Sequence, residues 1–216
     1  MEEKKKVKIK VVNANKSFKT QQVLKDVCIE CNAGEITGIV GRNGSGKTVL
    51  FKTICGLLVL DSGEVQIEGK IRKRAEILKE AGVIIEEPAF LRNYSGYKNL
   101  ELLYMINHKR NKKYLEGILE TVGLDPKSKK HVGKYSMGMK QRLALAQALM
   151  EKPEIFILDE PFNGLDNQGV EEMRQLFLRL KAEGCTILVA SHNAEDIRML
   201  CDHVYNMDGG VLSMVR

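Results

Sequence analysis

Tryptophan is absent from this sequence, and only four prolines and 6% aromatic residues occur among its 216 residues. Its apolar runs are short: one of the longest, residues 54–60, falls well below the roughly 20 residues that span a bilayer. Residues 1–7 also lack the apolar core of a signal peptide. We therefore expect a cytoplasmic protein, in which any membrane role depends on a partner.

Five cysteines, an odd number without a disulfide framework, fit a reducing compartment. Cys28 and Cys31 have the spacing of half a metal or redox site, but no second pair or histidine cluster accompanies them. In a strand over residues 27–31, positions three apart point to opposite faces. We expect no metal or redox chemistry there.

The net charge is +6, with basic runs at residues 4–6 and 108–113. Such runs form solvated faces or surfaces that face anions such as lipid headgroups. Aromatic residues do not interleave with them, so we expect no nucleic-acid partner. The 44% hydrophobic and 29% charged content is ordinary for a globular protein.

Residues 41–48 read Gly-Arg-Asn-Gly-Ser-Gly-Lys-Thr and fit the phosphate-binding pattern G-x-x-x-x-G-K-[ST]. A buried strand over residues 35–40 and a helix over residues 48–55 supply the strand–loop–helix context that the motif needs. A chance match in a glycine-rich turn is the alternative, and these flanks argue against it. The residues expected to line a nucleotide are Gly41, Arg42, Asn43, Gly44, Ser45, Gly46, Lys47, Thr48 and Val49.

The chemistry of that loop follows from its composition. Glycines let successive backbone N–H groups point inward at a polyphosphate, and the next helix adds its positive dipole end. Lys47 is expected to reach the β- and γ-phosphates, and the Thr48 hydroxyl is expected to hold Mg²⁺. The loop therefore predicts binding of a nucleotide together with Mg²⁺.

Alternating or continuous apolar patterns predict further elements on both sides of the loop. Two helices within residues 95–123 suggest a helical lobe, over about residues 90–150, inserted in an α/β core. The remaining expected elements before it are an edge strand over residues 7–12, strands over residues 27–31, 63–69 and 81–85, and a basic helix over residues 72–80.

The strand over residues 154–160 ends on Asp159 and Glu160. A buried strand does not end on paired acids for packing reasons, and at the carboxyl edge of a parallel sheet they face the ligand crevice. A strand over residues 186–190 leads to His192, and a hairpin turns at residues 208–210. A helix opening at Ser136 offers its N–H groups and hydroxyl to an anion, although an ordinary N-cap has the same pattern.

These motifs stand in a recognisable order: the loop at residues 41–48, a serine–glycine signature at residues 135–139, the acid-ended strand, Asp166 and His192. The chain thereby resembles, over nearly its whole length, the nucleotide-binding subunit of ABC (ATP-binding cassette) transporters. The resemblance implies a single P-loop NTPase domain over residues 1–216. It would have an ABC ATPase core with a mixed sheet, the inserted helical lobe and an N-terminal antiparallel β-subdomain.

In that family two cassettes close head-to-tail around two ATP molecules. The resemblance implies that Ser136 and Gly138 contact the γ-phosphate held by a second copy, and that Asp166 couples the two sites. Phe18 matches the position that stacks on adenine, although a packing role in a turn is nearly as compatible with the pattern.

The same resemblance implies the chemical roles at each site. Glu160 would polarise the attacking water, and His192 would contact the γ-phosphate, with Lys47 as the third catalytic group. The metal ligands would be Thr48, Asp159 and Glu86. These roles agree with phosphoryl transfer, where positioning and charge neutralisation do most of the work.

The sequence departs from the family pattern in the signature, usually Leu-Ser-Gly-Gly-Gln, where Tyr135, Met137 and Met139 stand instead. Glu86 occupies the position where the family usually has a glutamine that binds Mg²⁺. Glutamate also ligates Mg²⁺ but adds a negative charge beside a polyanion. This acidic variant resembles bacterial ATPases that export peptide antibiotics, including lantibiotic and bacitracin-type systems. The short stretch after the final hairpin leads us to expect no regulatory domain.

The leading hypothesis is an ATPase subunit, bound at the inner face of the cell membrane, that energises a separate permease for export of a peptide or drug-like substrate. The stretch containing Phe90, Leu91 and Tyr94 would form the groove for a permease helix. The alternative is a soluble cassette ATPase acting on nucleic acid or ribosomes, but those usually carry two cassettes or a long coiled-coil insertion. A degenerate regulatory cassette is disfavoured because the catalytic residues named above are present.

Overall fold

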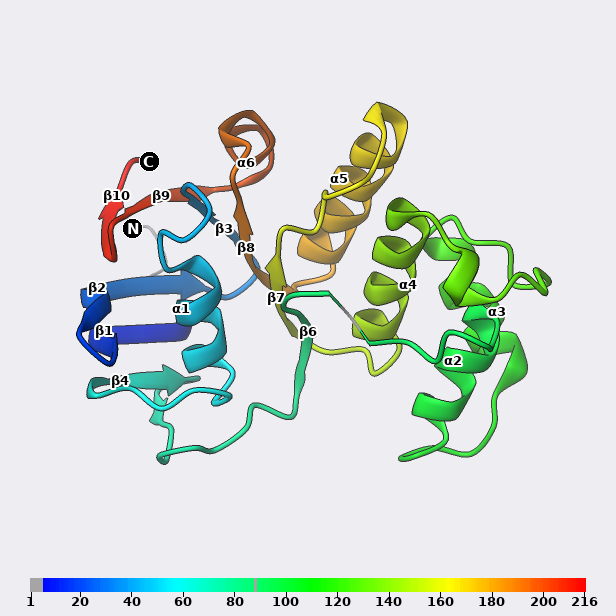
Figure 1. Cartoon of the computed structure of the whole chain (residues 1–216), viewed down its shortest axis with the longest axis horizontal. Helices are drawn as coiled ribbons and strands as arrows, with labels where there is room; N and C mark the ends of the chain where they lie inside the picture. The colour runs from blue at the N-terminus through cyan, green and yellow to red at the C-terminus, as the bar shows by residue number, and fades with distance from the viewer. Residues whose placement is uncertain (1–5, 88) are drawn as a thin grey trace.

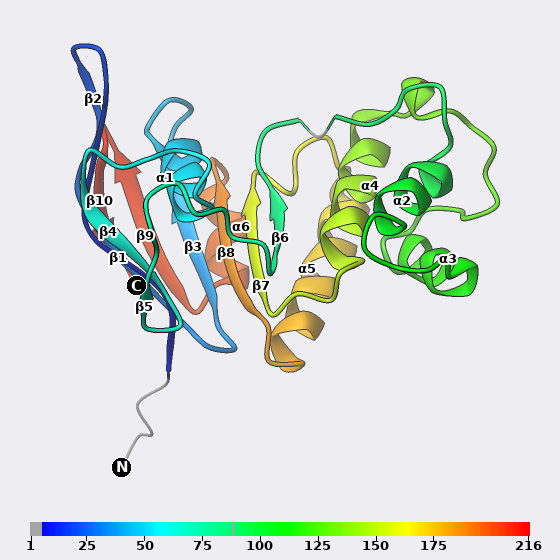
Figure 2. The same cartoon turned by 90° about the horizontal axis from the view of Figure 1, so that it is seen from below.

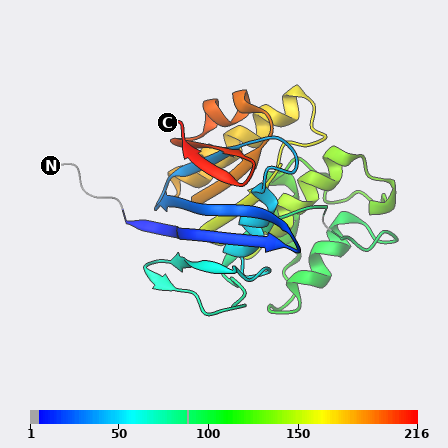
Figure 3. The same cartoon turned by 60° about the vertical axis from the view of Figure 1, so that its left-hand side comes forward.

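The computed structural model describes residues 6–87 and 89–216 and contains two β-sheets and a group of helices (Figure 1). The N-terminal sheet is four-stranded and antiparallel, in the order β2-β1-β4-β5. It forms a layer of its own in front of α1 in Figure 3. Its strands are β1 (Val7–Phe18), β2 (Gln21–Asn32), β4 (Ser62–Ile67) and β5 (Lys70–Ile71).

The second sheet has six strands in the order β10-β9-β3-β8-β7-β6. Five of them run parallel, and only β10 pairs antiparallel, with β9, so the sheet is mixed as predicted. The carboxyl ends of the parallel strands therefore meet at one edge. The strands are β3 (Ile36–Val40), β6 (Ala81–Ile84), β7 (Ile155–Asp159), β8 (Thr186–Ser191), β9 (His203–Asp208) and β10 (Val211–Met214).

The helices divide between the two faces of this sheet. One helix, α1 (Lys47–Ile54), buries its apolar side chains in the cluster shared with the antiparallel sheet (Figure 2). The helices of the other cluster are α2 (Gly96–Tyr104), α3 (Lys112–Thr121), α4 (Met137–Leu149), α5 (Asn167–Ala182) and α6 (Ala194–Leu200). None of the helices in the described residues is both long and apolar enough to cross a membrane.

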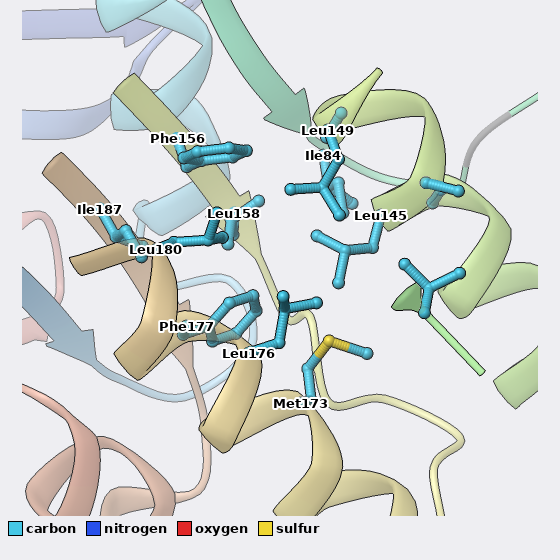
Figure 4. Close-up of a cluster of buried hydrophobic side chains, with 14 of the residues drawn as sticks. Ile84, Leu145, Leu149, Phe156, Leu158, Met173, Leu176, Phe177, Leu180 and Ile187 are labelled. Atoms are coloured by element: carbon cyan, nitrogen blue, oxygen red, sulfur yellow. The ribbon is translucent and has the colours of Figure 1, made fainter. Parts of the chain in front are cut away.

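Strand β7 shows how the sequence produces two cores. Its side chains alternate: Ile155 and Ile157 join the cluster around α1, while Phe156 and Leu158 join the cluster under α4 and α5. Figure 4 shows Phe156 and Leu158 among side chains from α4 and α5. A strand covered on both faces must be apolar throughout, which explains why polar residues begin only where β7 ends.

The strand prediction at the N-terminus was right in type but wrong in position within the sheet. Residues 7–12 belong to β1, which is an interior strand, because β2 pairs along one side and β4 along the other. The expected opposite orientation of Cys28 and Cys31 on β2 is confirmed, since Cys28 is exposed and Cys31 is fully buried. Burial raises the pKa of the Cys31 thiol to about 12.

The helix predicted over residues 72–80 is wrong. Ala75 has φ +58°, a left-handed conformation that interrupts a helix. The segment instead packs against the end of α1: the Leu78 N–H donates to the Cys55 carbonyl at 3.0 Å, and the Leu78 side chain is buried. A Cβ on Gly56 would lie 2.0 Å from the Glu76 carbonyl oxygen, so this close approach requires glycine.

A buried carboxylate holds the start of the predicted helical lobe together. Glu101 on α2 is only 3% exposed and accepts hydrogen bonds from Lys98 Nζ at 2.6 Å, Arg110 Nε at 2.6 Å and Tyr97 OH at 3.0 Å. The Lys98 hydrogen bond is the largest of the effects that lower the pKa of Glu101 to about 2. The segment that joins α2 to α3 is thereby tied back to α2.

We predict that Glu101→Gln lowers the free energy of unfolding by roughly 1–3 kcal/mol at pH 7. The pKa in the folded protein lies below the ordinary value of 4.5, so the ionised carboxylate stabilises the fold above that pH. This contribution is lost as the pH falls toward about 2. Urea unfolding followed by circular dichroism, at pH 7 and at steps below 4.5, measures the difference. A difference that stays constant across these steps would contradict the assignment.

Candidate functional site

The loop at residues 41–48 follows β3 directly and runs into the first two residues of α1, as the motif requires. Gly46 has φ +114°, which only glycine adopts without strain, and it precedes a helix whose N-terminus has no side-chain cap. The first N–H groups of a helix have no partner within it, so an uncapped N-terminus favours an anion. The loop geometry thus suits a polyphosphate.

Lys47 connects this loop to the acidic edge of the sheet. Its ammonium, almost fully buried, donates to the Gly41 carbonyl at 2.6 Å and to the Arg42 carbonyl at 3.3 Å. The same Nζ lies 3.5 Å from Glu160 Oε1. A flexible, compact cation in this position can exchange these oxygens for those of a phosphate.

Asp159 lies directly beside the loop. Its Oδ2 accepts a hydrogen bond of 2.5 Å from the Thr48 hydroxyl, while its buried Oδ1 has no hydrogen-bond partner among the described residues. Burial raises the pKa of Asp159, and the negative charges of Glu160 and Glu86 raise it further. A carboxylate in these surroundings favours a cation nearby.

Glu160 follows β7 and turns away from the strand with φ +51°. Its Oε2 is 2.9 Å from Nδ1 of His192, which follows β8. Positive φ is uncommon for a non-glycine residue and persists only where the surroundings enforce it, which often happens at functional sites. The neighbouring strands β7 and β8 thus bring this acid and this imidazole together.

Glu86 reaches the same edge from β6. Ile84 on β6 pairs with Leu158 on β7, and Glu86 and Glu160 each lie two residues beyond this residue pair. Glu86 also has positive φ, +61°, and its Oε1 accepts a 2.5 Å hydrogen bond from Lys52 on α1. The edge therefore gathers the loop with Glu86, Asp159 and Glu160.

Phe18 lies at the end of β1, where the chain turns into β2, and is 44% exposed. Its ring has Lys16 Nζ 5.6 Å from its centroid. The returning strand passes the phosphate loop, because a Cβ on Gly46 would lie 2.9 Å from the Val23 carbonyl. The ring is thus exposed on the hairpin that borders the loop.

Ser136 and Gly138 lie elsewhere. Ser136 caps α4, accepting a hydrogen bond from the Met139 N–H at 3.2 Å. A Cβ on Gly138 would lie 2.7 Å from the Gly164 carbonyl, so this packing requires glycine. In Figures 1 and 2 the start of α4 and the loop before α1 are well separated, with β6 and β7 between them. The structure does not bring these two halves of the predicted site together.

Two of the three variant signature residues, Tyr135 and Met139, have structural explanations, and so does Asp166. Tyr135 is buried, and its hydroxyl accepts a 3.2 Å hydrogen bond from the first N–H of α2, at Gly96. Met139 packs against the larger core cluster. Asp166 caps α5 by accepting a 2.8 Å hydrogen bond from the Gly169 N–H. A structural role therefore accounts for each of these side chains within one chain.

A cleft of about 690 Å³ joins the acidic edge to the helical region. One side consists of Thr48, Asp159 and Glu160, and the other includes Phe90, Arg92, Val132 and Met137. Sequence reasoning missed two polar residues that hydrogen-bond to the acidic residues of this edge. They are Lys52, described above, and Gln141, whose Nε2 lies 3.4 Å from the Glu160 carbonyl. Lys52 could have been found from helical spacing, because a residue four positions after Thr48 lies on the same face of the helix.

A family model described as "ABC transporter" matches residues 24–163. The chain belongs to the ABC transporter family. This confirms the resemblance drawn from the motifs, and it makes the chain an ATP-binding and ATP-hydrolysing cassette.

Two curated relatives and one solved structure illustrate the match. The bacitracin transport ATP-binding protein BcrA of Bacillus licheniformis is 41% identical over 91% of this chain, which spans 65% of the length of that relative. The lantibiotic transport ATP-binding protein SrtF of Streptococcus pyogenes is 35% identical over 91% of this chain and 85% of its own. The structure of cbiO1 from Clostridium perfringens, part of the ABC transporter complex cbiONQ, is 30% identical, with a TM-score of 0.82 over 96% of this chain and 87% of its own.

We predict that Glu160→Gln leaves ATP binding intact and lowers turnover at least ~100-fold, because the amide keeps the shape but loses the charge that polarises water. Fluorescent-nucleotide binding and phosphate release measure the two effects separately. Glu30→Gln, on the exposed face of β2, is the matched control and should keep normal turnover. Near-normal hydrolysis by Glu160→Gln would show that this residue does not polarise the attacking water.

Proposed function

We propose that this chain, as a single domain over residues 1–216, is the ATP-hydrolysing subunit of an ABC exporter and energises a separate membrane permease. The observation that carries the proposal is the sheet edge where the phosphate loop, Asp159, Glu160 and His192 converge. In the reaction, water attacks the γ-phosphorus, the bond to the bridging oxygen of ADP breaks, and ADP and phosphate leave. Glu160 orients the water, while Lys47 and His192 hold the γ-phosphate oxygens.

Mg²⁺ fits this edge. Among residues 6–87 and 89–216 no group of three or more acidic, histidine or cysteine side chains forms a metal cage. Mg²⁺ nevertheless is usually held by one or two carboxylates together with substrate phosphates and water. The buried, unpartnered Oδ1 of Asp159, the Thr48 hydroxyl and the Glu86 carboxylate are suitable oxygen donors. Bound there, the ion would neutralise charge on the β- and γ-phosphates.

The second copy of the chain completes the site in this proposal. Ser136 and Gly138 begin a helix whose N-terminus is suited to an anion, yet it lies away from the phosphate loop of its own chain (Figure 1). A head-to-tail dimer would bring this helix to the γ-phosphate held by the partner, with Phe18 on the adenine. Asp166, beside Gly164 on which Gly138 packs, would transmit the state of one site to the other.

The permease would bind at the cleft beside the helical region. Leu91 and Tyr94 at its margin are 52% and 46% exposed, and Phe90 lines the cleft itself. Exposed apolar side chains rimmed by charge mark surfaces that receive another protein. This partner would hold the cassette at the inner face of the membrane. The similarity to cbiO1, which is part of a transporter complex, supports the same arrangement.

For the cargo we propose a peptide antibiotic. The two curated relatives named above are bacitracin and lantibiotic transport proteins, and this chain also carries the acidic Glu86 of the pattern noted in its sequence. Neither relative's name refers to nucleic acid or ribosomes, so the alternative receives no support.

We predict that expressing this chain together with its permease subunits raises the concentration of bacitracin or of a lantibiotic needed to inhibit a sensitive host. The rise depends on hydrolysis, so Glu160→Gln should abolish it and Glu30→Gln should retain it. Minimum inhibitory concentrations measure the effect. Equal inhibition with the wild-type chain and with Glu160→Gln would contradict peptide export, whereas the ATPase assay above would be unaffected.

A further inference from the structure

Lys52 and Glu86 form an ion pair at the mouth of the nucleotide site. Lys52 lies on α1, one helical turn after Thr48, and its Nζ donates to Glu86 Oε1 at 2.5 Å. The Glu86 side chain is 63% exposed, while that of Lys52 is 25% exposed. The pair therefore connects the helix that begins at the phosphate loop with the segment that leaves β6.

The negative charge around the site explains why Glu86 needs a cation beside it. ATP is a polyanion, and the edge already presents the carboxylates of Asp159, Glu160 and Glu86. Lys47 lies 3.5 Å from Glu160 and partly neutralises it. Lys52 is the cation in contact with Glu86. Without that cation, the Glu86 carboxylate would repel the incoming phosphates, and salt in the solvent would screen this repulsion only in part.

The pair also fixes where the Glu86 side chain points. The backbone at Glu86 is held at φ +61° just beyond β6, but an exposed glutamate side chain on its own samples several rotamers. Its contact with α1 keeps the carboxylate near Thr48, on the same helix, and near Asp159, to which Thr48 is hydrogen-bonded.

We propose that Lys52 is a positioning residue for nucleotide binding: it neutralises Glu86 and holds its carboxylate beside the phosphate-loop helix, so that an acid is tolerated next to ATP. Lys52 acts through Glu86 and contacts neither substrate nor metal in this role. Its importance therefore depends on the charge at residue 86, which provides the test.

The experiment is a double-mutant cycle on ATP binding, using Lys52→Met, Glu86→Gln and the double variant. A fluorescent ATP analogue is titrated into the full chain in low salt with EDTA, so the reading does not depend on Mg²⁺ or on hydrolysis. In the presence of Glu86, Lys52→Met should weaken binding roughly threefold to tenfold. In the Glu86→Gln background the same change should have little effect. Because the repulsion is screened, the loss should shrink as salt is added.

Two further variants separate this role from a structural one. Lys52→Arg preserves the charge and should bind like the wild type. Lys10→Met removes an exposed lysine from its 2.6 Å pair with Glu30 on the antiparallel sheet and should not change affinity. Melting temperatures of all variants verify folding. Equal weakening by Lys52→Met in both backgrounds, or no weakening in either, would overturn the proposal. Either result would leave the transport proposal standing, because this experiment measures nucleotide binding alone.

Discussion

The crowding of negative charge at one edge of a parallel sheet is the constraint on which the rest of this site depends. The last residue pair between β6 and β7 is Ile84 with Leu158, and Glu86 and Glu160 each follow two residues later, with Asp159 before Glu160. Burial and these neighbours raise the pKa of Asp159. Such an edge is stabilised by cations, which the chain supplies through Lys47 and Lys52 and to which a bound Mg²⁺ ion would add.

The same architecture leaves the site one-sided. The acids face a cleft whose far wall includes Met137 and Gln141 from the start of α4, but neither Ser136 nor Gly138 lines it. Ser136 and Gly138 already have structural tasks there, as a helix cap and as a close contact with Gly164. On our account their second task, binding phosphate, requires another copy of the chain. ATP would then act as the contact between copies, because it binds both surfaces.

Much of this site could be predicted because its signals are contiguous in the sequence. The phosphate loop and the acids that end β7 are local patterns whose chemistry leaves few alternatives. The pairing of Lys52 with Glu86 could not be predicted, since it depends on β6 leaving the sheet beside α1. Similarly, β1 became an interior strand only because β4 returns to pair with it, and Ala75 interrupts an expected helix through a backbone conformation that no pattern announced. The helix α6 was missed because its seven residues are too few for an apolar pattern to repeat at helical spacing.

The central claim, that each chain holds half of two sites, is tested most directly by mixing two inactive variants. Lys47→Ala disables the phosphate loop, and Ser136→Asp retains a helix cap while adding a negative charge where a phosphate would bind. In a head-to-tail dimer of the two, one site combines an intact loop with an intact signature. We predict that the mixture hydrolyses ATP well above the sum of the separate variants, and that a chain carrying both substitutions rescues neither. A mixture no more active than its components would contradict the shared site.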